Sequence, residues 1–248
     1  MTDYRYLLRL GDDSLIATQR LLQWCTVAPQ IEEDIALSNI ALDQLGQARA
    51  LLSYAGELEG SGRDEDALAY LRNEQDFTNV ALVELPNEDF AVTVAKMLAF
   101  SAYQHELYHR LADSADARIS AIAVKAGKEV AYHLDHFSAW AVRLGDGTAE
   151  SHARMTFAVD AVWPWTHELF RSDPVFAAAA TGRYGVDPTQ LRPSWLSRID
   201  EVLTSATVTR PADGWAPEGA RAGLHTEHFG FLLAEMQSLH RAHAGVSW

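Results

Sequence analysis

The feature that most constrains this chain is helical periodicity, sustained over long stretches and interrupted mainly by proline and glycine. Apolar residues recur at helical spacing over residues 13–28, 31–58, 87–111 and 117–144. Pro29, Gly60 and Gly145 lie where three of these stretches end, as expected of residues that stop helices. Four long helices joined by short and medium loops predict an all-α, up-down four-helix bundle.

Shorter helical stretches follow or separate these four. We expect a short helix over 66–71, a helix that Thr148 caps and Pro164 interrupts, and further helices over 173–180, 187–205 and 226–241. Residues 207–223 are rich in Pro and Gly and indicate an irregular segment, and no stretch alternates strongly enough to predict a strand. The sequence therefore predicts one helical domain over residues 1–248, with the core bundle at about 12–144 and additional C-terminal helices over 148–248.

Charge and hydropathy exclude several classes of protein. The formal net charge is −14, so the surface repels the phosphates of nucleic acids and of anionic lipids. No apolar run reaches the ~18 residues that span a bilayer. Asp3, Arg5 and Arg9 interrupt the N-terminal apolar residues and argue against a secretory signal. We therefore expect a cytoplasmic protein that binds neither nucleic acid nor a membrane.

The single cysteine excludes an intramolecular disulfide and any metal site built from several cysteines. Cys25 shares an apolar stripe with Leu15, Thr18 and Leu22, so we expect it to be buried and unreactive. The sequence also contains neither a glycine-rich phosphate loop nor a Gly-x-Ser-x-Gly elbow.

The second long helix is apolar on nearly every face, which predicts burial on several sides. One stripe consists of Ile31, Ile35, Leu42, Leu45 and Leu52. A separate seam of small and polar residues would let a neighbouring helix approach closely, and it consists of Ala36, Asn39, Asp43, Gly46, Ala50 and Ser53.

Some four-helix bundles hold a di-iron centre. In these proteins two helices each supply one Glu ligand, and the other two helices each supply a Glu-x-x-His pair. The first predicted helix has no Asp or Glu over residues 14–30. In the second and fourth predicted helices, Gly46 and Tyr132 stand where a His is needed three residues after Asp43 and Glu129. In the third, Glu106 projects to roughly the opposite face from the apolar stripe, and the neutral amide Gln104 lies within the stripe. These degenerate di-iron positions are Asp43, Gly46, Gln104, Glu129 and Tyr132. We therefore expect no metal, no cofactor and no catalytic residue on this chain, and a hydrogen-bonded polar layer that includes Asp43, Gln104, His105, Glu129 and His133.

A second candidate metal site lies near the C-terminus. His225 and His228 are three residues apart, and Glu235 follows two helical turns later, so the three could hold zinc. The spacing matches neither His-Glu-x-x-His nor His-x-x-Glu-His, so it does not indicate a zinc protease.

Several motifs are more specific than a generic bundle. They are LDQLGQAR (42–49), SYA (53–55), KEVAYH (128–133), LGDGT (144–148), GLHTEH (223–228) and LAEMQ (233–237). Together they resemble the PaaC-type structural subunits of the bacterial phenylacetyl-CoA epoxidases. The resemblance extends from Leu10-Gly-Asp12 to Trp248, so it covers nearly the whole chain.

The resemblance implies a ferritin-like fold and a role in aerobic phenylacetate breakdown. In such complexes a homologous protein holds the di-iron centre and epoxidises the aromatic ring of the CoA thioester. A reductase with flavin and iron–sulfur groups supplies electrons from NADPH, and small accessory subunits are present. The PaaC-type subunit is understood as a non-catalytic partner, so the resemblance transfers no metal ligand to this chain.

Three functions remain open from the sequence. The first is a structural subunit that forms a homodimer or hetero-oligomer and stabilises a di-iron catalytic subunit. The second is a stand-alone di-iron oxidase or oxygenase, which needs an inward carboxylate on the first or third helix. The third is a small-molecule-binding bundle, which needs one large apolar pocket and no sizeable exposed apolar patch. Trp163, Trp165 and Trp215 are candidate partner contacts, because aromatic residues are enriched at interfaces.

Overall fold

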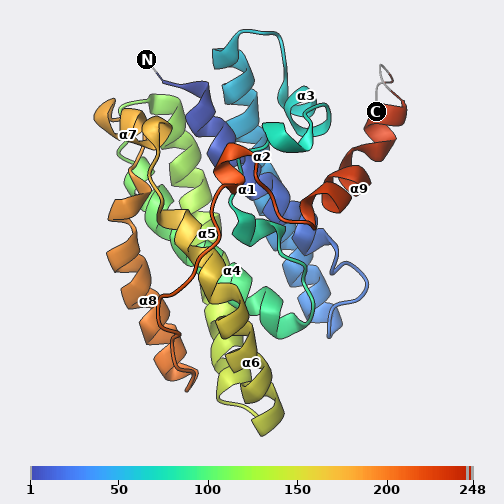
Figure 1. The fold of residues 1–248 in the computed structure, drawn as a ribbon, viewed down its shortest axis with the longest axis vertical. Helices are drawn as coiled ribbons and strands as arrows, with labels where there is room; N and C mark the ends of the chain where they lie inside the picture. The colour runs from blue at the N-terminus through green and yellow to red at the C-terminus, as the bar shows by residue number, and fades with distance from the viewer. Residues whose placement is uncertain (1, 244–245, 247–248) are drawn as a thin grey trace. The chain divides into compact units, whose positions relative to one another are not determined.

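The computed structural model describes residues 2–243 and 246, and all regular structure within them is helical (Figure 1). The α-helices are α1 (Tyr4–Leu22), α2 (Ile31–Glu59), α3 (Glu65–Tyr70), α4 (Phe90–Leu111), α5 (Ala117–Gly145), α6 (Ala149–Val162), α7 (Pro174–Thr181), α8 (Arg192–Ser205) and α9 (Phe229–Ala242). Short 3-10 helices are η1 (Glu74–Asp76), η2 (Ala81–Glu84), η3 (Trp163–Phe170), η4 (Pro188–Gln190) and η5 (Ala220–Ala222). The predicted all-α class is confirmed, and the elements are consistent with a ferritin-like helical bundle with extra helices.

The chain divides into two compact units. The N-terminal unit comprises residues 3–86 together with the described residues from 218 onward, and the central unit comprises residues 87–217 together with Thr2. The single domain expected from the sequence stays a prediction.

In the N-terminal unit, α1 and α2 form an antiparallel hairpin (Figure 1). Gly11 near the middle of α1 lies against Leu52 of α2, and the Thr18 hydroxyl donates to the carbonyl of Ala41 at 3.3 Å. α2 ends where Gly60 adopts a left-handed conformation with φ 71°, which glycine adopts without steric cost.

The first helix differs from the prediction. α1 begins at Tyr4 instead of residue 13, because the Asp3 carboxylate accepts from the Arg5 backbone N–H at 2.9 Å and caps the helix. Asp12 and Asp13 therefore lie inside α1 and are buried. α1 also ends at Leu22 instead of residue 28, so Cys25 lies in the following turn and is exposed, and its expected burial is wrong.

The second helix has the predicted length but not the predicted burial. Leu37, Ile40 and Leu51 of α2 are buried, whereas Ile31, Ile35 and Leu42 are exposed. The α1 hairpin partner covers one side of α2, so the prediction of burial on several sides is wrong.

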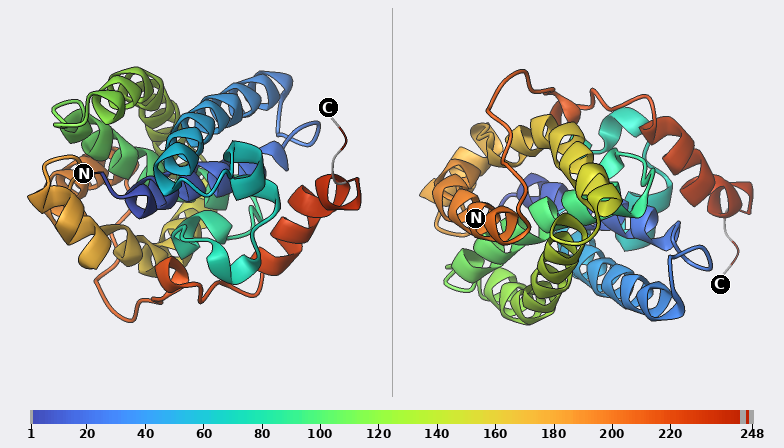
Figure 2. Two further views of the ribbon diagram at one scale, coloured as in Figure 1. Left: turned by 90° about the horizontal axis from the view of Figure 1, so that it is seen from above. Right: turned by 90° about the horizontal axis from the view of Figure 1, so that it is seen from below.

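In the N-terminal unit, the last helix, α9, packs on the segment of residues 65–77. α9 lies beside α3 and η1 (Figure 2). The Gln237 side-chain amide donates to the carbonyls of Ala69 at 3.0 Å and Arg72 at 3.1 Å, and Phe229 meets Phe77 edge-on at 5.6 Å between ring centroids.

The central unit is built on a second antiparallel hairpin, α4 with α5. Near one end the Ser120 hydroxyl donates to the Ala112 carbonyl at 2.6 Å, and near the other Phe90 packs edge-on against Trp140. Asp89 caps α4 by accepting from the Val92 N–H at 3.0 Å. The helix therefore begins at Phe90 and not at the predicted residue 87. α6 and α8 pack against this hairpin. Across the described residues, no helix is both long and apolar enough to cross a membrane.

Two glycines in helices should respond oppositely to alanine. A Cβ at Gly56 would lie far inside van der Waals contact with the carbonyl of Arg63, whereas a Cβ at Gly127 would lie 3.9 Å from the nearest atom, the Tyr108 Cβ. We expect Gly56→Ala to destabilise the fold by about 1–3 kcal/mol through overpacking. Gly127→Ala should stabilise it by up to about 1 kcal/mol through helix propensity. Urea unfolding of both variants tests this, and equal effects would contradict the packing described here.

Candidate functional site

The degenerate di-iron positions are divided between the two units. Asp43 and Gly46 are half-buried on α2 of the N-terminal unit. In the central unit, Gln104 is buried on α4, Tyr132 is exposed on α5, and the Glu129 carboxylate lies 3.0 Å from the Lys125 ammonium. Over residues 2–243 and 246, no group of three or more His, Cys, Asp or Glu side chains could hold a metal ion. The absence of metal from this chain and the single polar layer stay predictions.

The C-terminal zinc candidates are dispersed. His225 is buried, with Nδ1 2.6 Å from Glu84 Oε1 and Nε2 3.2 Å from the Phe77 carbonyl. His228 and Glu235 are not brought to it: the His228 ring faces the neighbouring Glu227 at 3.8 Å, and Glu235 is exposed on α9. Both ring nitrogens of His225 are thus engaged, so ligation of a metal would break an existing contact.

The buried polar centre of the N-terminal unit is instead built from residues that sequence reasoning missed. The inference that the first helix carries no carboxylate is wrong, because the earlier start of α1 includes Asp12 and Asp13. These residues supply the inward carboxylate that a stand-alone oxidase requires. The Asp3 cap directly before the apolar run of Tyr6, Leu7 and Leu10 is the signal that could have identified this start.

Asp12 is fully buried and pairs with Arg72. One guanidinium nitrogen of Arg72 lies 3.0 Å from Asp12 Oδ2, and the other bonds Oδ1. Oδ2 also accepts from the Thr78 N–H at 2.9 Å and from the Thr78 hydroxyl at 3.0 Å. The guanidinium stacks on the Phe77 ring, 4.1 Å from its centroid. This bidentate, hydrogen-bonded geometry is the one in which a buried ion pair is tolerated.

Asp13 pairs in the same way with Arg221, which comes from η5 far along the chain. The two guanidinium nitrogens lie 3.0 and 2.8 Å from the carboxylate oxygens, and the Val80 N–H donates to Oδ1 at 2.8 Å. Arg221 also donates to the carbonyls of Thr78 at 2.8 Å and Arg9 at 3.2 Å. Burial raises the pKa of Asp13 to about 6, although Arg221 acts in the opposite direction.

Glu84 completes the centre. Its carboxylate meets the His225 ring, accepts from the Asn79 amide at 2.8 Å and accepts from the Thr226 N–H at 2.8 Å. Its carbonyl accepts from the Arg20 guanidinium at 2.8 Å. The three carboxylates thus join α1, the 72–84 segment and the 221–226 segment.

This buried centre does not fit a di-iron site. Each of its three carboxylates is already engaged by a guanidinium or by imidazole and backbone donors. A cation placed there would face the fixed positive charges of Arg72 and Arg221, which repel it. The arrangement is suited to holding three chain segments together.

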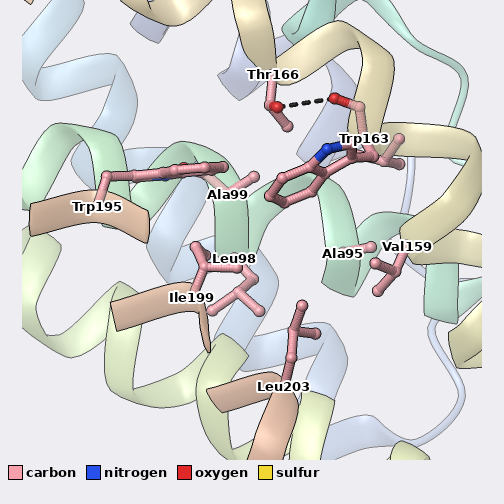
Figure 3. A pocket seen from close by; sticks show the side chains of 10 residues that line it. Ala95, Leu98, Ala99, Val159, Trp163, Thr166, Trp195, Ile199 and Leu203 are labelled. Atoms are coloured by element: carbon pink, nitrogen blue, oxygen red, sulfur yellow. Dashed lines mark hydrogen bonds between the residues drawn. The ribbon is translucent and has the colours of Figure 1, made fainter. Parts of the chain in front are cut away.

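The central unit contains a small apolar cavity between α4, α6 and α8 (Figure 3). Trp163 and Trp195 face it with ring centroids 5.5 Å apart, and Ile199 and Leu203 line its far side. Its volume is about 20 Å³, room for about one water molecule and far too little for an aromatic ring. Trp163 is therefore buried here, and its prediction as a partner contact is wrong.

A larger hollow lies between α4 and α5. It has a volume of about 330 Å³ and is lined by His105, Tyr108, His109, Val124 and Lys128 among others. It is an open groove of mixed polarity. Neither of these two hollows is the single large apolar pocket that a small-molecule-binding bundle requires.

Several large apolar side chains are exposed instead. Three lie on α2, and others are spread over the remaining helices and loops, among them Val124, Tyr132, Phe157, Trp215, Leu224, Phe231 and Leu239. Trp215 is exposed, and its role as a partner contact stays a prediction. Contiguous exposed apolar surface marks interaction sites in soluble proteins.

Comparison with known proteins agrees with the motifs. The family model described as "Phenylacetic acid catabolic protein" matches residues 1–248. The chain is 45% identical over 243 residues to the C subunit of the 1,2-phenylacetyl-CoA epoxidase from Escherichia coli (strain K12), and the alignment covers 98% of each protein. The resemblance predicted from the motifs is confirmed, although Trp248, where it ends, lies outside the described residues.

Removal of Arg221 should be costly, because the buried Asp13 carboxyl then loses the cation that pairs with it. We expect Arg221→Met to destabilise the fold at pH 7.5 by about 3–5 kcal/mol. The double variant Asp13→Asn with Arg221→Met should recover part of that loss. Arg49→Met, which breaks the exposed Arg49–Glu65 pair, is the matched control and should cost less than about 1 kcal/mol. Equal losses in urea unfolding for the buried and exposed pairs would contradict this assignment.

The pKa of Asp13 predicts a pH dependence of stability. Because this pKa is about 6 in the folded chain and about 4 when unfolded, the folded state binds the proton more tightly between these values. This contribution is present in full below pH 4 and is lost as the pH rises through 6. The unfolding free energy of the wild type, relative to Asp13→Asn, should therefore fall by about 2 kcal/mol from pH 4 to pH 7. A constant or rising difference would show that the carboxyl is not desolvated.

Proposed function

Because this chain belongs to the phenylacetic acid catabolic protein family, we propose that it is a structural subunit of a multicomponent phenylacetyl-CoA epoxidase. In this role it stabilises the homologous di-iron catalytic subunit and performs no chemistry itself. A reductase and small accessory subunits complete the assembly, which acts in the cytoplasm on phenylacetyl-CoA. Neither nucleic acid nor a membrane takes part.

One observation carries the non-catalytic part of the proposal. Asp12 and Asp13, the carboxylates that α1 directs inward, are bound by Arg72 and Arg221. Each of these carboxylates is thus paired with a guanidinium in a bidentate contact. The residues of α1 therefore support the fold and leave no anionic oxygen available to a metal.

The exposed apolar side chains support the second part, assembly with a partner. Ile31, Ile35 and Leu42 share one face of a long, regular helix. Burial of such residues stabilises association by removing apolar surface from water. A subunit whose role is to hold another protein is expected to present such a surface.

Within the complex, the di-iron centre of the catalytic subunit would supply oxygen activation. The residues of this chain act at a distance, by keeping the N-terminal unit rigid and presenting its surface to the partner. The buried ion pairs contribute rigidity because each fixes a side chain from a different segment.

Reconstitution with the catalytic subunit of the same organism tests the proposal. We expect the two proteins to co-purify, and we expect iron to be present in the complex but well below stoichiometric in this chain alone. The variant Asp43→Asn with Glu129→Gln should leave the iron content and the epoxidation rate within about twofold of wild type, because neither carboxylate is assigned a metal.

The opposite outcome would support the stand-alone oxidase. Near-stoichiometric iron in the isolated chain after chelation, lost in the Asp43→Asn, Glu129→Gln variant, would overturn the structural role. Failure of the wild-type chain to bind the catalytic subunit would also overturn it.

A further inference from the structure

The groove between α4 and α5 in the central unit lies where small residues face the neighbouring helix. α5 contributes Ala123, Gly127 and Ala131, one on each turn, and α4 contributes Ala112. A Cβ at Gly127 would meet no atom closer than the Tyr108 Cβ at 3.9 Å. The groove volume of about 330 Å³ falls in the range of about 300–1,000 Å³ that is usual for small-molecule sites. The three small residues of α5 form an apolar strip along one wall.

Three nitrogen-bearing side chains line the same groove. His105 and His109 lie one turn apart on α4, and Lys128 lies on α5. Because the two helices are antiparallel and Gly127 lies against Tyr108, Lys128 stands at the level midway between the two histidines. None of the described residues that line the groove is an Asp or a Glu.

These three side chains have few competing contacts. Among the described residues, the side chains of Lys128 and His109 form neither an ion pair nor a hydrogen bond. The Nδ1 atom of His105 is buried without a hydrogen-bond partner and lies 3.5 Å from the Glu106 carboxylate. Lys125, about one turn earlier on α5, is by contrast paired with a carboxylate at 3.0 Å. The donors of the groove are therefore available to a ligand.

The donor set favours an anion. A lysine ammonium donates three hydrogen bonds and accepts none, and an imidazole donates at least one. Donors from three side chains match a phosphate monoester, which has three terminal oxygens, better than a carboxylate, which has two. Hydrogen bonds between charged partners of this kind are stronger than neutral ones. The apolar strip beside them fits a flat ring that the phosphate carries.

A metal ion is the alternative occupant. Residues 105–109 read His-Glu-Leu-Tyr-His, which matches the helical zinc motif His-Glu-x-x-His. The Lys128 ammonium would repel a cation held by the two histidines. Over residues 2–243 and 246, moreover, no group of three or more His, Cys, Asp or Glu side chains could complete a coordination sphere. The surroundings of the motif thus favour an anion over zinc.

We propose that the α4–α5 groove binds a phosphate monoester carried on a planar, largely apolar body, the chemistry of a nucleoside monophosphate. Lys128, His105 and His109 hold the phosphate, and the apolar strip of α5 takes the ring. This site goes beyond the proposed structural role and does not depend on it.

Titration calorimetry of the full-length chain with adenosine 5′-monophosphate (AMP) tests the site. We expect a dissociation constant below about 1 mM for the wild type. Lys128→Met should bind about tenfold more weakly or worse, because it loses a charge-assisted hydrogen bond. The Lys128 side chain is exposed, so this variant should keep the wild-type circular dichroism and melting temperature.

The matched control is Lys125→Met, which removes the same charge from the same helix but outside the groove. It should bind AMP within about twofold of the wild type, since its ammonium does not face the ligand. Unchanged AMP affinity in Lys128→Met, or an equal loss in Lys125→Met, would overturn the proposal.

The apolar body is tested by Gly127→Leu, whose side chain would fill the strip without meeting the backbone. With the helical circular dichroism unchanged, AMP should bind about tenfold more weakly to this variant, whereas the weaker binding of inorganic phosphate should change little. If inorganic phosphate binds the wild type as tightly as AMP does, the ring has no place in the groove and the proposal fails.

Two further ligands identify the occupant. Zinc chloride that binds the wild type but not the His105→Asn, His109→Asn variant, in the absence of any AMP binding, would overturn the proposal in favour of a metal site. Adenosine 3′,5′-bisphosphate, the nucleotide end of CoA, separates a CoA ester from a free nucleotide. Tighter binding than AMP indicates the ester, weaker binding indicates the free nucleotide, and both results support the site. If the wild type binds neither nucleotide, the site is wrong while the structural role stands.

Discussion

Two buried carboxylates on one turn of α1 impose the strongest constraint on the N-terminal unit. A charged Asp side chain in an apolar interior costs several kcal/mol unless a cation and further donors satisfy it. Asp12 and Asp13 meet this requirement with Arg72 and Arg221, which come from two different segments. The folding of the 72–84 loop and of the 218–228 segment onto the α1–α2 hairpin is thereby coupled to the placement of these charges.

The same residues explain part of the family resemblance. The motif at residues 10–12 ends in Asp12, and the motif at 223–228 contains His225 and Thr226, which contact Glu84. Gly223, with φ 84°, is placed so that a Cβ would approach the Gln75 backbone at 2.7 Å. These motifs therefore serve the internal packing of the N-terminal unit. The LDQLGQAR motif includes Leu42, which is exposed on the outer face of α2. Its hydrophobic character is consistent with contact to another protein.

Sequence reasoning predicted the elements whose boundaries are set locally. The helices expected over 31–58 and 117–144 are observed as Ile31–Glu59 and Ala117–Gly145, because proline, glycine and capping side chains end them within one turn. It missed the start of α1, where the Asp3 cap was not considered, and with it the carboxylates of the buried centre. It also overestimated the burial of α2, because an apolar stripe looks the same whether a neighbouring helix of the same chain or another protein covers it.

The sequence alone determined the all-helical class, the family and most helix boundaries, since periodicity, caps and breakers act over a few neighbouring residues. Only the tertiary structure decided which charges pair, because Asp13 and Arg221 are separated by 208 positions along the chain. It also decided which apolar face stays in solvent, since burial depends on the elements that pack against a helix. A local sequence pattern specifies neither which distant charges pair nor which apolar face stays exposed.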